Sequence, residues 1–304
     1  MHSNRREFLK SSLAAGVTTG LGGSVFGRTA PATTSPTGKR AATDWVPLGH
    51  SGVQVTRLAF GTGTYSGQVQ RQLGQPEFTR LVRYAYDHGI RFFETADSYY
   101  GMPQMLATAL KGIPRDSYRL MTKYNTHETE DPKATIDRLR SDLGTEYVDI
   151  LLLHCVRNPA WSKQLEPLED QFSEAKSKKV ILSHGASVHG LPALRAFPGN
   201  QWLDVAMIRM NHKGTRMDTL DTHDTDNVGN VSEVVAHTQK VHAQGAGVIS
   251  MKLVGEGQFT RPEDREAAMK FAMNLGAVDA VTIGFKNTAE IDEALARMNR
   301  VLNV

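Results

Sequence analysis

Short apolar segments and longer amphipathic segments alternate along this chain from about residue 45 to its end. β-Branched and apolar residues dominate the short segments, and apolar residues recur at helical spacing in the longer ones. Strands that alternate with helices in this way form βα units and a parallel sheet. Eight units are predicted, with strands near residues 56–60, 91–94, 119–123, 148–154, 180–184, 205–210, 247–251 and 280–283, and with helices near residues 76–88, 103–111, 132–143, 165–178, 191–197, 231–244, 262–275 and 289–298.

Eight parallel strands close most simply into an α/β (β/α)8 TIM barrel, and one such barrel of about 250 residues fits within the 304 residues of the chain. We therefore predict a leader and linker over residues 1–43 and a single barrel domain over residues 44–304. The alternative is an open doubly wound sheet. Its G-x-G-x-x-G fingerprint is missing, because Gly61-Thr62-Gly63 lacks the third glycine.

Capping signals support three of the predicted helix starts. Asp131 precedes Pro132, which is a favoured residue at the first helical position. Thr260 and Asn287 are each followed three residues later by a glutamate, which is the spacing of a capping box.

The first forty residues predict an export signal. Asn4-Arg5-Arg6-Glu7-Phe8-Leu9-Lys10 matches the twin-arginine pattern at six of seven positions, with Asn4 in place of Ser or Thr. A weakly apolar stretch follows, and cleavage is expected after Ala30-Pro31-Ala32 or after Gly27, although a retained leader is an open alternative. These features predict folded export through the twin-arginine translocation machinery and a periplasmic or otherwise exported location.

The leader accounts for the alkaline isoelectric point. Residues 1–43 carry a net charge of +5 while the whole chain carries +3, so the remaining residues carry about −2. No basic patch interleaves with aromatic residues, so nucleic-acid binding is not expected. The apolar part of the leader is short and rich in glycine, and no other stretch is long enough, so we predict no membrane span in the mature chain.

Ionisable residues end three consecutive predicted strands. Glu94, Lys123 and His154 occupy these ends, and Tyr99 follows Glu94 by one loop turn. Catalytic groups of a βα barrel lie at the C-terminal ends of its strands, so we expect these four side chains to meet. An ammonium near a tyrosine favours the phenolate and lowers its pKa from about 10, and a carboxylate would hold that ammonium in place.

This combination suits proton transfer at a carbonyl during hydride transfer, and it lacks the paired nucleophile and base of acyl transfer. A metal site is not predicted, because His184, His189, His212 and His223 do not form a motif such as H-E-x-x-H.

At these residues the chain resembles the aldo/keto reductase family, over most of residues 46–300. Phe93-Glu94-Thr95-Ala96-Asp97-Ser98-Tyr99 resembles the F-D-T-A-x-x-Y motif of that family. Met121-Thr122-Lys123 and Leu153-His154 match its lysine and histidine positions. Leu48–Val53, Leu58–Gly63, Gly185–Ser187, Gly247–Lys252 and Val281–Gly284 resemble its opening hairpin and its first, fifth, seventh and eighth strands.

The resemblance implies NAD(P)-dependent interconversion of a carbonyl and an alcohol on a small-molecule substrate. Tyr99 would be the general acid/base, Lys123 its pKa modulator, Glu94 the partner of the lysine and His154 the group that orients the substrate. The cofactor would be NADP, or NAD, and the residues expected to bind it are Thr62, Gly63, Ser187, Met251, Lys252, Gly284, Lys286 and Asn287.

The chain departs from the family pattern at several positions. Glu94 replaces the usual Asp and adds a methylene to the arm, so its reach to Lys123 is in question. Tyr100 follows Tyr99 where glycine is common, so Tyr100 is the alternative catalyst. Ile291 falls near the position of the arginine that binds a 2′-phosphate, for which Lys286 is a candidate substitute. The departures leave a second hypothesis open, namely a non-catalytic barrel that binds a cofactor or ligand.

Overall fold

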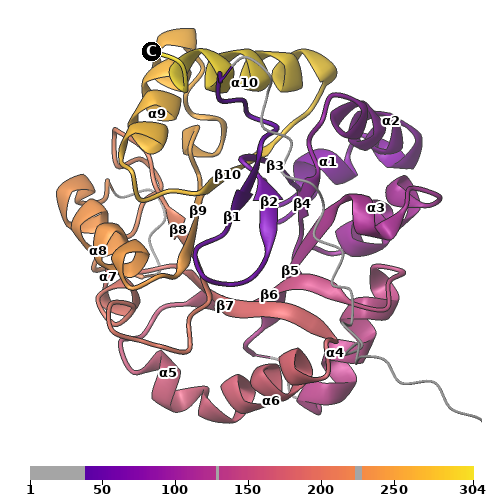
Figure 1. Cartoon of the computed structure of the whole chain (residues 1–304), viewed down its shortest axis with the longest axis vertical. Helices are drawn as coiled ribbons and strands as arrows, with labels where there is room; N and C mark the ends of the chain where they lie inside the picture. The colour runs from indigo at the N-terminus through magenta and orange to yellow at the C-terminus, as the bar shows by residue number, and fades with distance from the viewer. Residues whose placement is uncertain (1–37, 128–129, 223–227) are drawn as a thin grey trace, which may run out of the picture. The chain divides into compact units, whose positions relative to one another are not determined.

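The computed structural model describes residues 38–127, 130–222 and 228–304, and the predicted twin-arginine motif and cleavage sites lie outside these residues. Eight parallel strands form a closed barrel in the order β10-β3-β4-β5-β6-β7-β8-β9 (Figure 1), so the barrel prediction is confirmed and the open sheet is excluded. The strands are β3 (Leu58–Gly61), β4 (Phe92–Glu94), β5 (Arg119–Asn125), β6 (Val148–Val156), β7 (Ile181–Val188), β8 (Val205–Arg209), β9 (Gly247–Met251) and β10 (Ala280–Gly284).

Helices surround the barrel and follow the strands in the expected alternation (Figure 1). They are α1 (Gln68–Arg71), α2 (Gly74–Asp87), α3 (Met102–Leu110), α4 (Pro132–Asp142), α5 (Trp161–Gln164), α6 (Glu166–Ser177), α7 (Leu191–Leu194), α8 (Val231–Ala243), α9 (Pro262–Asn274) and α10 (Thr288–Val301), with 3-10 turns η1 (Arg115–Ser117) and η2 (Gly255–Gly257).

Two predicted elements differ from the observed ones. The strand predicted at residues 56–60 is split between β2 (Gln54–Thr56), which pairs with β1 (Trp45–Pro47) in an antiparallel hairpin, and β3 of the barrel. At the split, the Thr56 hydroxyl donates a hydrogen bond to Leu58 O at 2.9 Å. The helix predicted at residues 191–197 ends at Leu194, because the chain turns there toward Pro198-Gly199.

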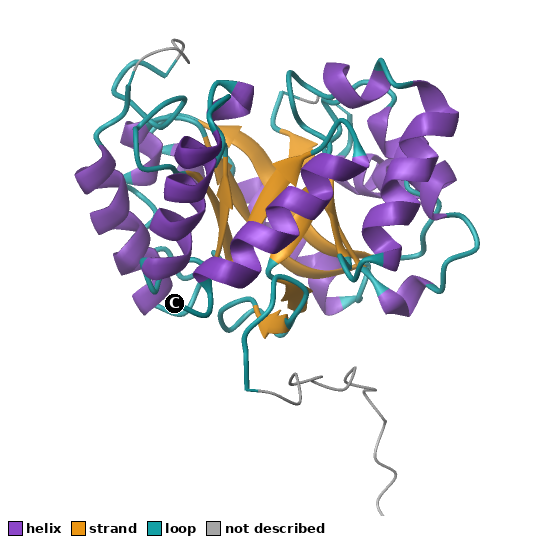
Figure 2. Cartoon of the chain, turned by 90° about the horizontal axis from the view of Figure 1, so that it is seen from above, coloured by secondary structure: helices purple, strands orange, loops and turns teal. Residues whose placement is uncertain are grey.

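The hairpin closes the N-terminal end of the barrel. Its residues Val46, Leu48, Val53 and Val55 are buried in one apolar cluster with inward-facing strand residues. Figure 2 shows the two short strands at one end of the barrel. The strand-end residues at the opposite, C-terminal end are therefore the ones available for binding and chemistry.

Two of the three predicted helix caps are confirmed. The Asp131 carboxylate accepts a hydrogen bond from Ala134 N at 3.0 Å, and the Asn287 side chain accepts one from Glu290 N at 3.0 Å. The prediction for Thr260 is wrong. Pro262 is the first residue of α9, so Arg261 occupies the cap position and no side chain caps this helix.

Residues 40–43 of the predicted linker pack against the barrel. Arg40 donates to Leu302 O at 2.7 Å, and Ala42, which is fully buried, donates through its backbone to Asn299 Oδ1 at 2.7 Å. These contacts tie the start of the folded body to α10.

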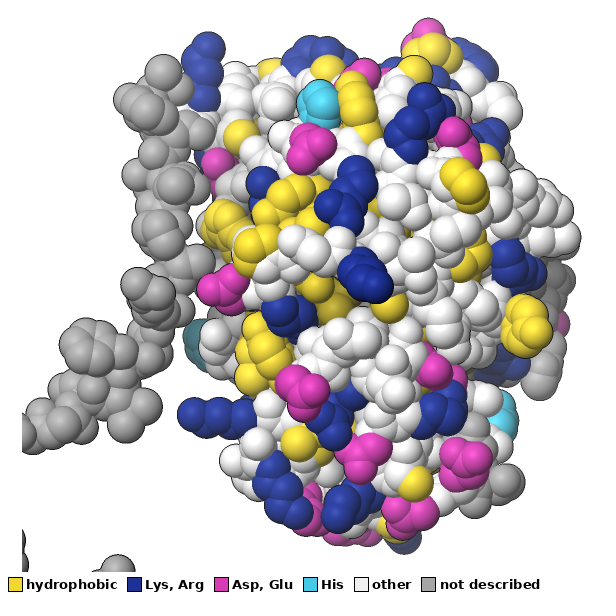
Figure 3. Space-filling view, turned by 90° about the vertical axis from the view of Figure 1, so that its right-hand side faces the viewer, with side chains coloured by type: hydrophobic (Ala, Val, Ile, Leu, Met, Phe, Trp, Pro, Cys, Tyr) yellow, Lys and Arg dark blue, Asp and Glu magenta, His cyan; other side chains and the backbone are white. Residues whose placement is uncertain are grey.

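No helix among the described residues is long and apolar enough to cross a membrane. The face shown in Figure 3 carries acidic and basic side chains interspersed, rather than a basic stripe.

Candidate active site

The ends of β4 and β5 bring Glu94, Lys123 and Tyr99 into direct contact. Lys123 is fully buried, and its ammonium donates to Glu94 Oε1, to Thr95 O at 3.0 Å and to Tyr99 Oη at 3.3 Å. An ammonium has three donors, so this arrangement satisfies all of them. The longer arm of Glu94 therefore reaches Lys123.

The second oxygen of Glu94 faces the neighbouring strands. Glu94 Oε2 accepts a hydrogen bond from Thr282 Oγ1 of β10 at 3.4 Å. A Cβ added to Gly61 of β3 would lie 2.6 Å from Thr282 Oγ1 and 3.0 Å from Glu94 Oε2. A glycine at position 61 thus makes room for the carboxylate, and three strands together hold it.

His154 stands beside Tyr99 at the end of β6. The ring centroids of the two residues are 5.6 Å apart in an edge-to-face arrangement, and His154 is 8% exposed. His154 Nδ1 lies 3.0 Å from Ser98 Oγ. This contact occupies Nδ1 and leaves Nε2 for a ligand.

Burial sets the protonation states of the two rings. It raises the pKa of the Tyr99 phenol well above 10, and the nearby Glu94 carboxylate raises it further. Burial, followed by the charge of Lys123, lowers the pKa of His154 well below 6.5. Glu94 pairs with Lys123 and itself raises the pKa of the phenol, and the expectation that Lys123 lowers this pKa stays a prediction. Both rings are neutral at neutral pH.

The geometry separates Tyr99 from Tyr100. The Tyr100 side chain is 83% exposed, and its ring lies near the Arg71 guanidinium at 5.9 Å. A Cβ added to Gly63 would lie only 2.5 Å from Tyr99 Oη, so glycine at this position allows Tyr99 to reach Lys123.

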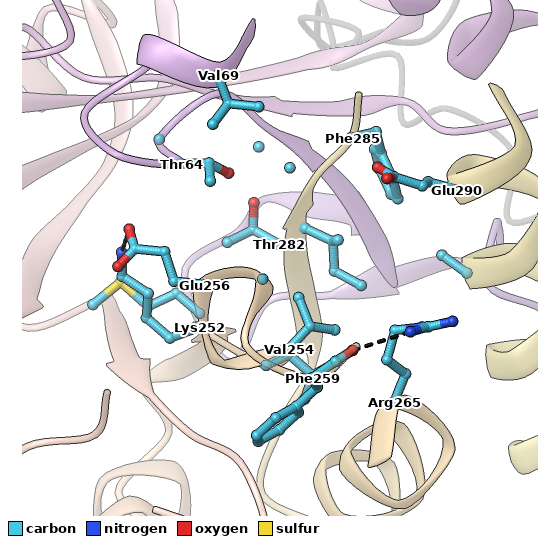
Figure 4. Close-up of a pocket in the computed structure, with 18 of the residues that line it drawn as sticks. Thr64, Val69, Lys252, Val254, Glu256, Phe259, Arg265, Thr282, Phe285 and Glu290 are labelled. Atoms are coloured by element: carbon cyan, nitrogen blue, oxygen red, sulfur yellow. Dashed lines mark hydrogen bonds and ion pairs between the residues drawn. The ribbon is translucent and has the colours of Figure 1, made fainter. Parts of the chain in front are cut away.

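A cavity of about 640 Å³ extends from Tyr99 and Glu94 past the ends of β9 and β10 toward α9 and α10. Figure 4 shows Thr282 near its middle, with Lys252 and Glu256 to one side and Arg265 and Glu290 to the other. Five of the predicted cofactor residues line the cavity: Gly63, Met251, Lys252, Gly284 and Lys286.

The other three predicted cofactor residues lie outside the cavity wall. Thr62 and Ser187 are fully buried, and neither hydroxyl oxygen has a hydrogen-bond partner. Buried polar atoms are rarely left unpaired in native proteins, so both hydroxyls have capacity for one further hydrogen bond, as do other buried hydroxyls such as those of Thr95 and Thr122. Asn287 uses its side-chain carbonyl to cap α10.

The sequence did not indicate the role of Glu256, which joins two loops across the cavity. Its carboxylate pairs with Lys252 Nζ and accepts a hydrogen bond from Tyr65 N at 3.3 Å. Tyr65, Lys252 and Glu256 all have left-handed backbones, with φ of 48°, 58° and 55°. Non-glycine residues in this region cluster at ligand sites, which supports the cavity as a binding site.

Ion pairs organise the outer end of the cavity. Arg265 pairs with Glu293 at 2.6 Å, Arg297 pairs with Glu293 at 2.8 Å, and Lys286 Nζ lies 3.7 Å from Glu290. Among the described residues no group of three His, Cys, Asp or Glu side chains is placed to hold a metal ion.

The family model for "Aldo/keto reductase family" matches residues 57–303. The chain belongs to the aldo/keto reductase family. The match covers the whole barrel, including the four side chains at its C-terminal mouth.

Curated relatives match shorter segments of the chain than the family model does. L-Galactose dehydrogenase from Arabidopsis thaliana is 32% identical over 159 residues, which cover 48% of this chain and 48% of the relative. A probable aldo-keto reductase 1 from Glycine max is 30% identical over 148 residues, which cover 43% of this chain and 40% of the relative. The chain thus matches less than half of the length of these relatives.

Solved structures match at the level of the fold. A putative aldo-keto reductase from Pseudomonas aeruginosa has a TM-score of 0.69 and 19% identity, and the match covers 87% of this chain and 98% of that chain. The holo form of an aldo-keto reductase from Bacillus halodurans has a TM-score of 0.66 and 17% identity, with 85% and 94% covered. Both show that this aldo/keto reductase family member shares their barrel fold.

Proposed function

We propose that this protein is an NAD(P)-dependent oxidoreductase that interconverts a carbonyl and an alcohol by hydride transfer. The observation that carries the proposal is the Tyr99 hydroxyl, which meets the Lys123 ammonium at the inner end of a ligand-sized cavity. Curated relatives include dehydrogenases of L-galactose, D-arabinose and glycerol, so small hydroxy or carbonyl compounds are the proposed substrates.

Tyr99 would donate its proton to the carbonyl oxygen. Its raised pKa keeps it as a phenol at neutral pH, which is the form that a proton donor needs. His154 would donate a hydrogen bond from Nε2 to the same oxygen, because Ser98 occupies Nδ1. Lys123 and Glu94 would hold Tyr99 in place and balance each other's charge inside the barrel.

The dinucleotide, when bound, supplies or accepts the hydride. The cavity residues Gly63, Met251, Lys252, Gly284 and Lys286 would contact it, and the hydroxyls of Thr62 and Ser187 would gain a partner from it. Asn287 would contribute indirectly, because its side chain caps α10, and α10 forms the adjoining cavity wall.

We propose NADP as the dinucleotide, with NAD as the alternative. Lys286, whose exposed ammonium lies 3.7 Å from Glu290, would attract a 2′-phosphate as a point charge, whereas Arg265 and Arg297 pair more closely with Glu293. The printed name of glycerol 2-dehydrogenase (NADP(+)) from Saccharomyces cerevisiae agrees with this choice for that relative.

We also propose export of the folded protein through the twin-arginine machinery, based on Arg5 and Arg6 in their motif. Because this route carries folded proteins, a dinucleotide loaded before export would cross with the barrel. Tight binding is then expected, with the dinucleotide recycled in place.

The experiment uses the full chain expressed with its own leader. We expect the exported fraction to hold a bound dinucleotide, detected by absorbance and mass, and to reduce aldehydes. The matched variant Arg5→Lys with Arg6→Lys should keep the protein in the cell interior, where it folds and turns over substrate normally.

Three outcomes separate the parts of the proposal. If the arginine variant turns over substrate and is found in the same location as the unchanged protein, only the export proposal is contradicted. Dinucleotide binding without turnover of any aldehyde, ketone or alcohol would favour the binding-module hypothesis. If the protein neither binds a dinucleotide nor turns over substrate, the oxidoreductase and the binding-module hypotheses are both contradicted.

A further inference from the structure

Arg157 and Arg57 are the two arginines of the described residues whose side chains take part in no hydrogen bond or ion pair. Arg57 lies away from the barrel mouth, beside Asp44 and Asp279. The Nε of Arg157 is buried and has no partner, whereas its two terminal nitrogens remain accessible. The buried Nε is a donor whose lost hydration is not replaced, which costs free energy.

Arg157 lies at the mouth of the barrel, on the side of His154. It directly follows β6, three residues after His154. The next strand lies against it: His189 N donates to Val156 O at 2.9 Å, and a Cβ added to Gly190 would lie 3.3 Å from Arg157 O. Arg157 therefore belongs to the loops around the proposed reaction centre.

The other cations of this mouth have carboxylate partners. Arg209, which is buried at the end of β8, pairs with the buried Asp218 at 2.5 Å. Lys123 pairs with Glu94, and Lys252 pairs with Glu256. Arg157 is thus the cation whose charge these ion pairs leave uncompensated.

Neighbouring titratable groups respond to this charge. After burial, the charges of Lys123, Arg157 and Lys252 lower the pKa of His154. Burial and then the charge of Arg209 lower the pKa of His189, and Arg157 adds to the effect. The surroundings of the His154 and His189 rings are therefore electropositive, on the side of the mouth where Arg157 lies.

We propose that the substrate carries a carboxylate or phosphate group, and that Arg157 binds this anion while the reacting carbon faces Tyr99. This inference rests on the proposed oxidoreductase function and names its substrate class. The planar guanidinium suits both oxyanions, because its parallel N–H groups match two oxygens at once.

The test compares substrates that differ in charge alone. Succinate semialdehyde and butanal share a four-carbon aldehyde, and D-glyceraldehyde 3-phosphate and D-glyceraldehyde share a three-carbon one. We expect kcat/KM for the anionic member of at least one pair to exceed that of the neutral member by about tenfold or more. The pair with the larger ratio distinguishes carboxylate from phosphate.

Arg157→Gln should lower the ratio of kcat/KM for the anionic aldehyde to kcat/KM for the neutral aldehyde by about tenfold, mainly by raising KM for the anionic one. Arg157→Lys should restore part of this ratio. Arg57→Gln is the matched control. The Arg57 guanidinium also has a buried, unpartnered Nε, but it lies beside Asp44 and Asp279 near the hairpin end of the barrel. The ratio should be unchanged in this control.

Equal kcat/KM within both pairs for the unchanged protein would overturn the inference, and so would an Arg157→Gln variant that slows both members of a pair equally. If no aldehyde is reduced, the oxidoreductase proposal fails, and calorimetric titration with succinate and inorganic phosphate still tests Arg157. Anion binding that Arg157→Gln does not weaken would then overturn the inference.

Discussion

At the scale of single residues, the site depends on close approaches that leave no room for a side chain. Gly63 faces Tyr99 Oη and Gly61 faces the Thr282 hydroxyl and Glu94. Neither glycine is required by a left-handed backbone, since neither has a positive φ. Both are therefore required by the packing of the acid–base group itself.

Gly63→Ala is predicted to abolish most carbonyl reduction while the barrel stays folded. The added methyl displaces Tyr99 Oη from Lys123, and misplacement of about 1 Å can cost on the order of a hundredfold in rate. Gly112→Ala is the control: its Cβ meets nothing within 4 Å, but its φ of 84° strains an alanine. That variant should lose about 1 kcal/mol of stability. Its rate should not change.

Steady-state kinetics and thermal unfolding of the two variants provide the measurement. A Gly63→Ala protein with normal kcat would show that Tyr99 tolerates displacement, contrary to the geometry proposed here.

At the scale of elements, the caps and loops decide which residues shape the cavity. Asn287→Ala is predicted to lower the free energy of unfolding by about 1 kcal/mol, because Glu290 N loses its acceptor at the start of α10. Dinucleotide affinity should fall only a few-fold, since Asn287 supports the cavity wall and does not line it.

Asp131→Ala is the matched variant, because Asp131 caps α4 by the same kind of contact. Urea unfolding and fluorescence titration compare the two. A loss of dinucleotide affinity by a hundredfold or more in Asn287→Ala would show that the amide binds the dinucleotide directly.

Alternation and strand-end residues sufficed to predict the barrel strands, most of the helices and the meeting of Glu94, Lys123, Tyr99 and His154. These features depend on local periodicity and on the geometry of a closed barrel, which fixes where strand ends lie. The partner of Glu94 in β10, Thr282, was not predictable in this way. It is 188 residues away in sequence, and its role follows from the register of β10 and β3.

Ser98 and Glu256 illustrate the same limit in loops. Ser98 is an ordinary loop residue in the sequence, and only the fold places its hydroxyl at His154 Nδ1. Glu256 takes part in the site because a left-handed turn brings it back to Lys252. Loop paths of this kind leave no periodic signal.

At the scale of the whole molecule, stability depends on pH because the buried His154 and the partly buried His189 are neutral in the folded protein. The folded-state pKa values of His154 and His189 are lowered well below 6.5. The unfolded chain therefore binds more protons than the folded one below about pH 6.5, and stability falls as pH decreases through this range.

His189→Gln is predicted to flatten this dependence between pH 7 and pH 5, since one such histidine contributes at most about 1.4 kcal/mol per pH unit. The measurement is the free energy of unfolding in urea at several pH values, and His127→Gln, at an exposed position, is the control. An unchanged slope in His189→Gln would contradict a neutral His189 in the folded protein.

The most direct test of the account is the rate of carbonyl reduction in Tyr99→Phe compared with Tyr100→Phe. Tyr99 is the hydroxyl that meets Lys123, whereas Tyr100 is exposed. Loss of the proton donor should lower kcat by about a hundredfold or more in Tyr99→Phe, with dinucleotide affinity retained, while Tyr100→Phe keeps the original kcat. Equal rates in the two variants, or loss of activity in Tyr100→Phe alone, would contradict the assignment of Tyr99 as the proton donor.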